Sequence, residues 1–200
     1  MSNKPLDRNE IHAACLRGEL WVNTAVQSSA SPDTADVSAA VPAKEMDKFP
    51  EKAEFTGLGY SGTDIKQAWS WYPVVIDIDG IDAYLPLPVL GDHVNRCSSS
   101  LGQHTTLSLD NSSVMSTGVI YPRYSSVAAY IYNTDALGHK WQMSIAGPIR
   151  SIEEVKDGEQ VTVNNRVFTG PLYIVRRMTL REITVVPVGA DVNTQFSIKK

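Results

Sequence analysis

The sequence predicts a β-rich α+β fold, a small barrel or sandwich with a few helices around it. After about residue 54, strand-like runs recur at intervals of roughly 8 to 15 residues and are separated by turn residues. Only residues 6–20 and 125–138 fit a helix better than a strand. A chain of 200 residues with 42% hydrophobic and 20% charged residues has the composition of one soluble globular domain.

Composition also narrows the classes of partner and cofactor. The net charge of −4 disfavours a protein whose main partner is nucleic acid, since phosphates require a basic surface. Neither a secretory signal nor an apolar run of about 18 residues is present, so we expect a soluble intracellular protein with no membrane partner. Cys15 and Cys97 are far apart and belong to no ligand cluster. We therefore expect a reduced chain that binds no metal and needs no cofactor.

Three segments are expected along the chain: an N-terminal helical arm (1–23), a flexible linker (24–53) and the main domain (54–197). The linker is rich in Ala, Ser, Pro, Asp and Thr and has little to bury. In the arm, Asp7 or Asn9 is expected to cap the helix. The apolar face of that helix would consist of Ile11, Ala14, Cys15 and Leu16.

Turn residues place hairpins within the main domain. Residues 71–90 read as a strand, a tight turn at Asp79–Gly80 and a returning segment. Residues 104–121 read as two strands around an Asn111–Ser112 turn, and residues 159–170 as a hairpin around Asn164–Asn165.

The second helix is expected over residues 125–138. Ser125 or Ser126 can cap its start, and Gly138 can end it in the left-handed conformation. Its buried side would consist of Val127, Tyr130, Ile131 and Leu137.

A serine and a histidine are the first candidates for chemistry. In the strand "KWQMSIAG", Ser144 lies on the face opposite Trp141, Met143 and Ile145. In "LPVLGDHVNR", His93 follows an apolar run where a strand gives way to a loop. A histidine there can take a proton from a serine on a neighbouring strand and return it to a leaving amine. The alternatives are an ordinary polar serine and a solvated loop histidine.

Glu182 is the next candidate, in the strand "TLREITVVPV". Both faces of this strand are mostly apolar, which is typical of a strand covered on both sides. A carboxylate there needs a partner. An ion pair with Arg176 or Arg177 would satisfy it, and so would an imidazole that it orients.

Arg176 and Arg177 end a strand and are expected to point to opposite faces. One of them can order a loop whose N–H groups stabilise an oxyanion, or both are simply solvated. The chain contains no Walker or dinucleotide-binding pattern, and Ser144 is not in a GxSxG elbow.

Three blocks in this order resemble the tailed-phage prohead maturation proteases, which are related to the herpesvirus assemblins. They are "LPVLGDHVNR", then "KWQMSIAG", then "LREITVVPVGADVNT", and the resemblance as a whole spans about residues 74–195. The last block matches best, through Leu180, Glu182, Thr184, Val186, Gly189, Ala190 and Thr194. Departures include Thr184 where serine is common and Gly189 where proline is expected.

The resemblance implies a serine endopeptidase with an assemblin-like fold, a small antiparallel β-barrel with a few surrounding helices. Ser144 would be the nucleophile, His93 the general base and Glu182 the third member that orients His93. Because assemblins use a second histidine as third member, His104 and His139 remain alternatives to Glu182. Arg176 and Arg177 resemble the paired arginines that support the assemblin oxyanion site.

The resemblance also implies partners and a location. The substrates would be the phage scaffolding protein and major capsid protein, cleaved in the host cytoplasm inside the procapsid. We expect a homo-oligomer, with a dimer as one form, and self-cleavage within residues 24–52. One rival function is a non-catalytic β-barrel assembly module, in which Ser144 and His93 would lie apart. Another is a different hydrolase or acyltransferase with a pocket sized for a small molecule.

Overall fold

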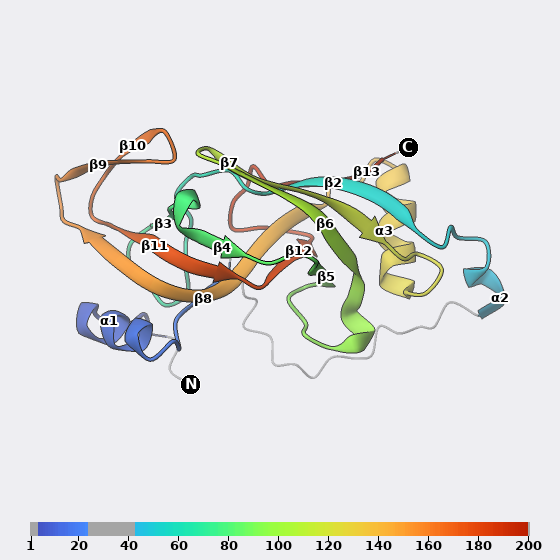
Figure 1. The fold of residues 1–200 in the computed structure, drawn as a ribbon, viewed down its shortest axis with the longest axis horizontal. Coiled ribbons are helices and arrows are strands. Elements are labelled where there is room, and N and C mark those ends of the chain that lie inside the picture. Colours follow the sequence, from blue (N-terminus) through green and yellow to red (C-terminus); the bar gives the residue numbers. More distant parts are fainter. Residues whose placement is uncertain (1–3, 24–42, 200) are drawn as a thin grey trace.

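The computed structural model describes residues 4–23 and 43–199, and its main feature is one curved sheet (Figure 1). Nine strands lie in the order β13 (Gln195–Ile198), β2 (Ala53–Tyr60), β7 (Ser113–Ile120), β6 (Ser100–Asp110), β5 (Leu87–Gly91), β12 (Glu182–Val186), β8 (Gln142–Val155), β11 (Leu172–Leu180) and β3 (Val74–Ile76). Two further strands complete the sheet of 11, because β1 (Trp21–Asn23) pairs with β8 and β4 (Ile81–Ala83) pairs with β11.

The expected small antiparallel barrel is wrong, although the β-rich class is right. The sheet is mixed, because β5 runs parallel to β12, and β3 and β4 run parallel to β11. Its end strands β13 and β3 do not pair with each other within the described residues. One isolated bridge, Trp141 to Phe196, brings β13 against the start of β8, so the sheet curls without closing.

The long strand β8 explains why the sheet stays open. Its first half pairs with β12, and its second half pairs with β11 through a bulged register. Close backbone approach at Gly147 accompanies the change of partner, because a Cβ there would lie 1.9 Å from the Thr179 carbonyl oxygen. The ribbon therefore continues past the curled part, as β8 and β11 show at the left of Figure 1.

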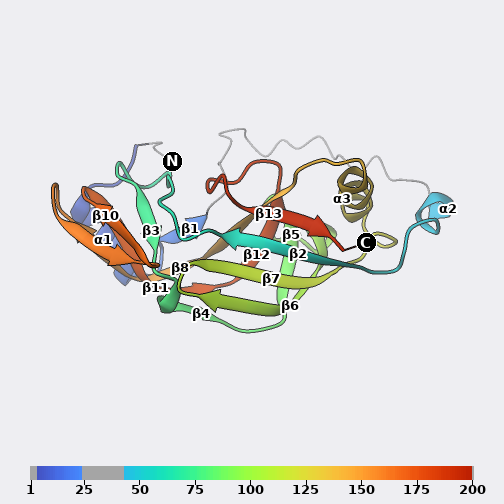
Figure 2. The same ribbon diagram turned by 90° about the horizontal axis from the view of Figure 1, so that it is seen from above.

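Both predicted polar hairpins are present. β6 and β7 pair around residues 111–112 and lie side by side in Figure 2. β9 (Gln160–Val163) and β10 (Arg166–Thr169) pair around Asn164–Asn165, both of which have positive φ.

The predicted hairpin turn at Asp79–Gly80 is wrong. Residues 78–80 form a 3-10 turn, and the flanking strands β3 and β4 both pair with β11 instead of with each other. A Cβ at Gly80 would lie 1.7 Å from the Arg176 carbonyl oxygen. The glycine therefore permits a close backbone crossing, which produces the same sequence signal as a turn.

The N-terminal arm is part of the main core. Helix α1 (Arg8–Leu16) begins with a capping box between Asp7 and Glu10. Ile11, Ala14 and Cys15 are buried in the same apolar cluster as the sheet, whereas Leu16 is exposed, contrary to the predicted face. Residues 24–42 of the predicted linker lie outside the described residues. Its remainder contains the short helix α2 (Ala43–Met46) and the start of β2.

Helix α3 (Ser126–Ala136) has the predicted cap at Ser125 but a different buried face. Ala128, Ala129 and Ile131 are buried, while Val127, Tyr130 and Leu137 are exposed. The helix therefore packs through two alanines and one isoleucine. It lies near β13, at the opposite end of the molecule from α1 (Figure 1).

Candidate active site

Ser144 lies on β8 directly opposite Thr184 of β12, and Ala146 lies opposite Glu182. Directly opposed residues of antiparallel strands share a face, so Ser144 and Glu182 belong to the same side of the sheet. Small residues on this part of β8 leave room for the larger groups of the site. Ser144 itself is fully buried.

A strained turn brings His93 over the same face. Asp92 and His93 have φ values of 52° and 58°, and the Val94 N–H donates to the Gly91 carbonyl at 3.0 Å. Two successive left-handed residues other than glycine are uncommon, and such strain is concentrated at functional sites. The turn follows β5, whose parallel pairing with β12 places Gly91 opposite Val185, and the Asp92 N–H donates to the Val185 carbonyl at 3.3 Å.

The structure brings Ser144, His93 and Glu182 into one hydrogen-bonded chain. His93 Nε2 lies 2.7 Å from Ser144 Oγ, and His93 Nδ1 contacts Glu182 Oε1. An ionised carboxylate only accepts hydrogen bonds, so Nδ1 carries the proton and Nε2 accepts from the serine hydroxyl. This is the arrangement that proton transfer from serine to histidine requires.

Glu182 has a second donor as well as His93. The Thr184 hydroxyl donates to Glu182 Oε1 at 3.4 Å from two residues along the same strand. Among the alternatives left open by the sequence, the structure therefore pairs Glu182 with an imidazole. The ion pairs described for Arg176 and Arg177 involve other carboxylates.

The two alternative third members lie elsewhere. His104 Nε2 donates to the Ile183 carbonyl at 2.9 Å, and its Nδ1 accepts from Ser116 Oγ at 3.1 Å. Burial lowers the pKa of His104 to about 4, against a smaller opposing effect of its backbone hydrogen bond. His139 packs against the Trp141 ring, with ring centroids 4.4 Å apart. Neither contacts His93 by any hydrogen bond within the described residues.

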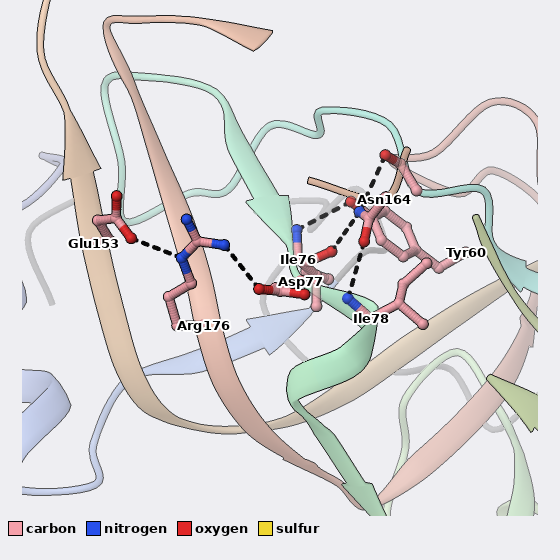
Figure 3. Close-up of polar contacts among 8 residues, drawn as sticks. Tyr60, Ile76, Asp77, Ile78, Glu153, Asn164 and Arg176 are labelled. Carbon is pink, nitrogen blue, oxygen red and sulfur yellow. Dashed lines mark hydrogen bonds and ion pairs between the residues drawn. The ribbon is translucent and has the colours of Figure 1, made fainter. Parts of the chain in front are cut away.

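Arg176 and Arg177 do not reach the site, so their assignment as oxyanion support is not compatible with the geometry. Arg176 lies between Glu153 and Asp77, at 2.6 and 2.8 Å (Figure 3). Arg177 lies opposite Ser151, seven residues from Ser144 along β8. That separation is about 23 Å at the usual rise per residue. The two arginines hold β11 to its neighbours instead.

The same region contains a second structural junction. The Asn164 side chain donates to the Ile76 carbonyl at 2.7 Å and accepts from the Ile78 N–H at 3.0 Å (Figure 3). Tyr60 Oη accepts from the Ile76 N–H at 3.0 Å, and burial raises the pKa of this phenol. These contacts attach both the β9–β10 turn and β2 to β3 and to the turn that follows it.

A large cavity of about 2000 Å³ opens beside His93 and Glu182. Most of its other walls come from the N-terminal arm, the 63–69 loop and the 188–192 loop, and strands β5 and β8 contribute Pro88, Leu90 and Ala146. The site therefore borders an extended groove lined by segments far apart in the sequence.

Sequence reasoning missed the residues that hold one wall of this groove. Asp191 is buried and accepts from the Ser61 N–H at 2.6 Å and from the Asn193 N–H at 3.0 Å. Gln142 accepts from the Gly189 N–H at 2.8 Å and donates to the Val192 carbonyl at 2.9 Å. The Asp-x-Asn spacing of "ADVNT" is a signal for such a local turn.

Comparison of the chain with protein-family models, with curated proteins and with solved structures finds no match. In the part of the chain that the structure describes, no helix is both long and apolar enough to cross a membrane. The same residues include no group of three or more His, Cys, Asp or Glu side chains arranged to hold a metal ion.

Proposed function

We propose that this chain is a serine endopeptidase with Ser144 as nucleophile, His93 as general base and Glu182 as the residue that orients His93. The observation that carries the proposal is the continuous contact from Ser144 Oγ through both ring nitrogens of His93 to Glu182. Three strands and one strained turn are needed to assemble it. An accidental group of polar side chains has no reason to connect serine, histidine and carboxylate in this sequence.

The chemistry follows from the positions of the protons. Ser144 Oγ attacks the peptide carbonyl carbon while its proton passes to His93 Nε2, and Glu182 stabilises the resulting imidazolium. Collapse of the tetrahedral intermediate breaks the C–N bond, and His93 gives its proton to the leaving amine. Water then attacks the acyl-enzyme, with His93 again taking and returning a proton, and releases the carboxylate product.

The groove supports a polypeptide substrate over a small molecule. A cavity of about 2000 Å³ exceeds the roughly 300–1,000 Å³ typical of small-molecule sites. The rival assembly module predicts that Ser144 and His93 lie apart, and a separation of 2.7 Å does not fit that expectation.

The biological role in this proposal is maturation of a phage prohead, and it rests on the resemblance of the three sequence blocks. The substrates would then be the scaffolding and major capsid proteins. Because Ser144 has no exposed surface, a substrate reaches Oγ only after part of its cover moves. We propose accordingly that binding of a polypeptide in the groove moves this cover.

Co-expression with the scaffolding and major capsid proteins of the phage that encodes the chain tests the function. The wild type is expected to produce new N-termini in these proteins, and Ser144→Ala is expected to produce none. Cleavage by neither form, or equally by both, with both chains folded, would favour the non-catalytic assembly module.

A further inference from the structure

The N-terminal arm forms part of the groove beside the candidate active site. Residues from α1 and β1 border the same cavity as His93, Ala146 and Glu182. The arm is held there by backbone pairing with β8, by the buried face of α1 and by an Arg8–Glu154 ion pair of 2.6 Å. It is therefore a fixed wall of the groove.

The strand register places Trp21 on the face of the sheet that carries Ser144. Trp21 lies opposite Pro148, and Asn23 lies opposite Ala146, in the antiparallel β1–β8 pair. Ser144, Ala146 and Pro148 are alternate residues of one strand and share a face. Because opposed residues share a face too, the Trp21 side chain lies on the same side as Ser144 and Glu182.

The backbone of Trp21 is fixed while its indole stays partly exposed. The Trp69 indole N–H donates to the Trp21 carbonyl at 3.0 Å, and the Ile149 N–H donates to the Leu20 carbonyl at 2.8 Å. The Trp21 side chain nevertheless has 47% exposure within a cavity wall. A rigid, half-exposed tryptophan is a frequent anchor for a binding partner.

Further apolar surface borders the same cavity. Val188 and Val192 are both exposed, on the loop that Gln142 and Asp191 hold in place. The groove thus offers apolar contacts from the arm and from the loop that follows β12. This combination suits an aromatic or aliphatic side chain.

We propose that Trp21 is a specificity-determining residue that contacts an aromatic or aliphatic side chain of the substrate. Pro148, opposite Trp21, lies four residues from Ser144 along β8, which is about 13 Å. An extended peptide covers that distance in roughly four residues. The preferred apolar residue is thus about four positions from the cleaved bond. This inference rests on the endopeptidase function proposed above.

Cleavage-site profiling tests the inference with the full-length chain. Peptides from a digested bacterial proteome are incubated with wild type, Ser144→Ala, Trp21→Ala, Trp21→Phe or Trp71→Ala, and new termini are identified by mass spectrometry. Trp71 is a matched control, because it is 66% exposed and is not among the described residues that border the cavity. Urea unfolding of each variant verifies the fold.

In peptides cut by wild type and by Trp71→Ala, apolar residues are expected to be about fourfold more frequent than in the uncut peptides at one position, about four residues from the cleaved bond. Trp21→Ala is expected to lose this enrichment while still cleaving, and Trp21→Phe to retain most of it. An unchanged profile in Trp21→Ala, or no apolar enrichment in wild type, would overturn the inference and leave the endopeptidase function standing. Absence of any Ser144-dependent cut among these peptides would overturn the inference, and absence in co-expression as well would overturn the endopeptidase function too.

Discussion

Among the described residues, two histidines form a side-chain hydrogen bond with a serine, and only one of these two pairs continues to a carboxylate. Ser144 contacts His93 at 2.7 Å, and Ser116 contacts His104 at 3.1 Å. In both pairs the far ring nitrogen donates a hydrogen bond, so the near nitrogen accepts from the serine hydroxyl in each. A search for serine beside histidine would return both.

The difference lies in what receives the far hydrogen bond. His93 donates to the Glu182 carboxylate, whereas His104 donates to the neutral Ile183 carbonyl. A carboxylate stabilises the imidazolium that forms when histidine takes the serine proton, and a peptide carbonyl does so far less. Burial also disfavours a charge on His104, as the lowering of its pKa to about 4 reflects. The second pair is therefore a neutral structural contact.

Access separates the pairs as well. His93 and Glu182 border the large cavity, while His104 and Ser116 are buried and do not belong to its described walls. The Phe55 ring packs at right angles to the His104 ring, with centroids 5.2 Å apart. Catalytic capability thus depends on the third group and on access together.

The largest expected effect comes from exchanging the two serines for alanine. Ser144→Ala should lower the rate of substrate cleavage by about 10³-fold or more relative to wild type, because the nucleophile is lost. Ser116→Ala should leave cleavage within about threefold and lower the free energy of unfolding by about 1–2 kcal/mol, because His104 Nδ1 loses its donor. Gel densitometry of substrate cleavage and urea unfolding measure the two quantities. Loss of cleavage in a well-folded Ser116→Ala would transfer the nucleophile role to the other pair.

Glu182→Gln should lower cleavage by about 10²- to 10⁴-fold without loss of fold. The amide keeps the size of the side chain but carries no charge to stabilise the imidazolium. Glu153→Gln is the matched control, because Glu153 pairs with Arg176 on the distant part of β8. Single-turnover rates and near-ultraviolet circular dichroism provide the measurements. An active Glu182→Gln beside an inactive His139→Gln would identify a different third member.

The order of the three sequence blocks was enough to propose Ser144, His93 and Glu182 together. Local chemistry also predicted a helix cap at Asp7 or Asn9, of which the structure shows Asp7, and the Asn164–Asn165 turn, since both depend on residues close in sequence. The left-handed turn at Asp92–His93 carried no such signal. Asp and His tolerate positive φ better than most residues, but neither requires it, so the surrounding structure imposes this conformation.

Long-range pairing accounts for most of what the sequence could not predict. The parallel pairing of β5 with β12 joins segments about 90 residues apart, and nothing in either strand specifies that neighbour. The arginines show a related difficulty. Arg176 and Arg177 follow the serine at a suitable distance along the chain, but β8 and β11 run antiparallel and carry them away from Ser144. Chain spacing does not determine distance across a sheet.

Because His104 is buried in its neutral form, it should make the free energy of unfolding depend on pH. Its folded pKa of about 4 lies below the ordinary histidine value near 6.5. As the pH falls below 6.5, this histidine is protonated in the unfolded chain but stays neutral in the folded chain. The unfolded state is thereby favoured, so the free energy of unfolding falls progressively until about pH 4. The expected loss is about 3 kcal/mol. Urea unfolding of wild type and His104→Gln between pH 7.5 and 4 measures it by difference, and equal slopes for both would contradict the assignment.

The smallest expected effect compares backbone strain beside the candidate active site with backbone strain in the β9–β10 hairpin. Asp92 and Asn165 both have left-handed backbones, with φ of 52° and 57°. Alanine at either position should lower the free energy of unfolding by about 1 kcal/mol, because a Cβ without a local polar partner is disfavoured there.

Only Asp92→Ala should also lower cleavage, by several-fold, because its turn positions the His93 ring against Ser144 and Glu182. Asp92→Gly should restore cleavage, since glycine adopts positive φ without strain. Cleavage rates and urea midpoints of the three variants test this. A loss of activity in Asn165→Ala equal to that in Asp92→Ala would mean that activity follows global stability, and the turn at His93 would then have no special part in positioning the ring.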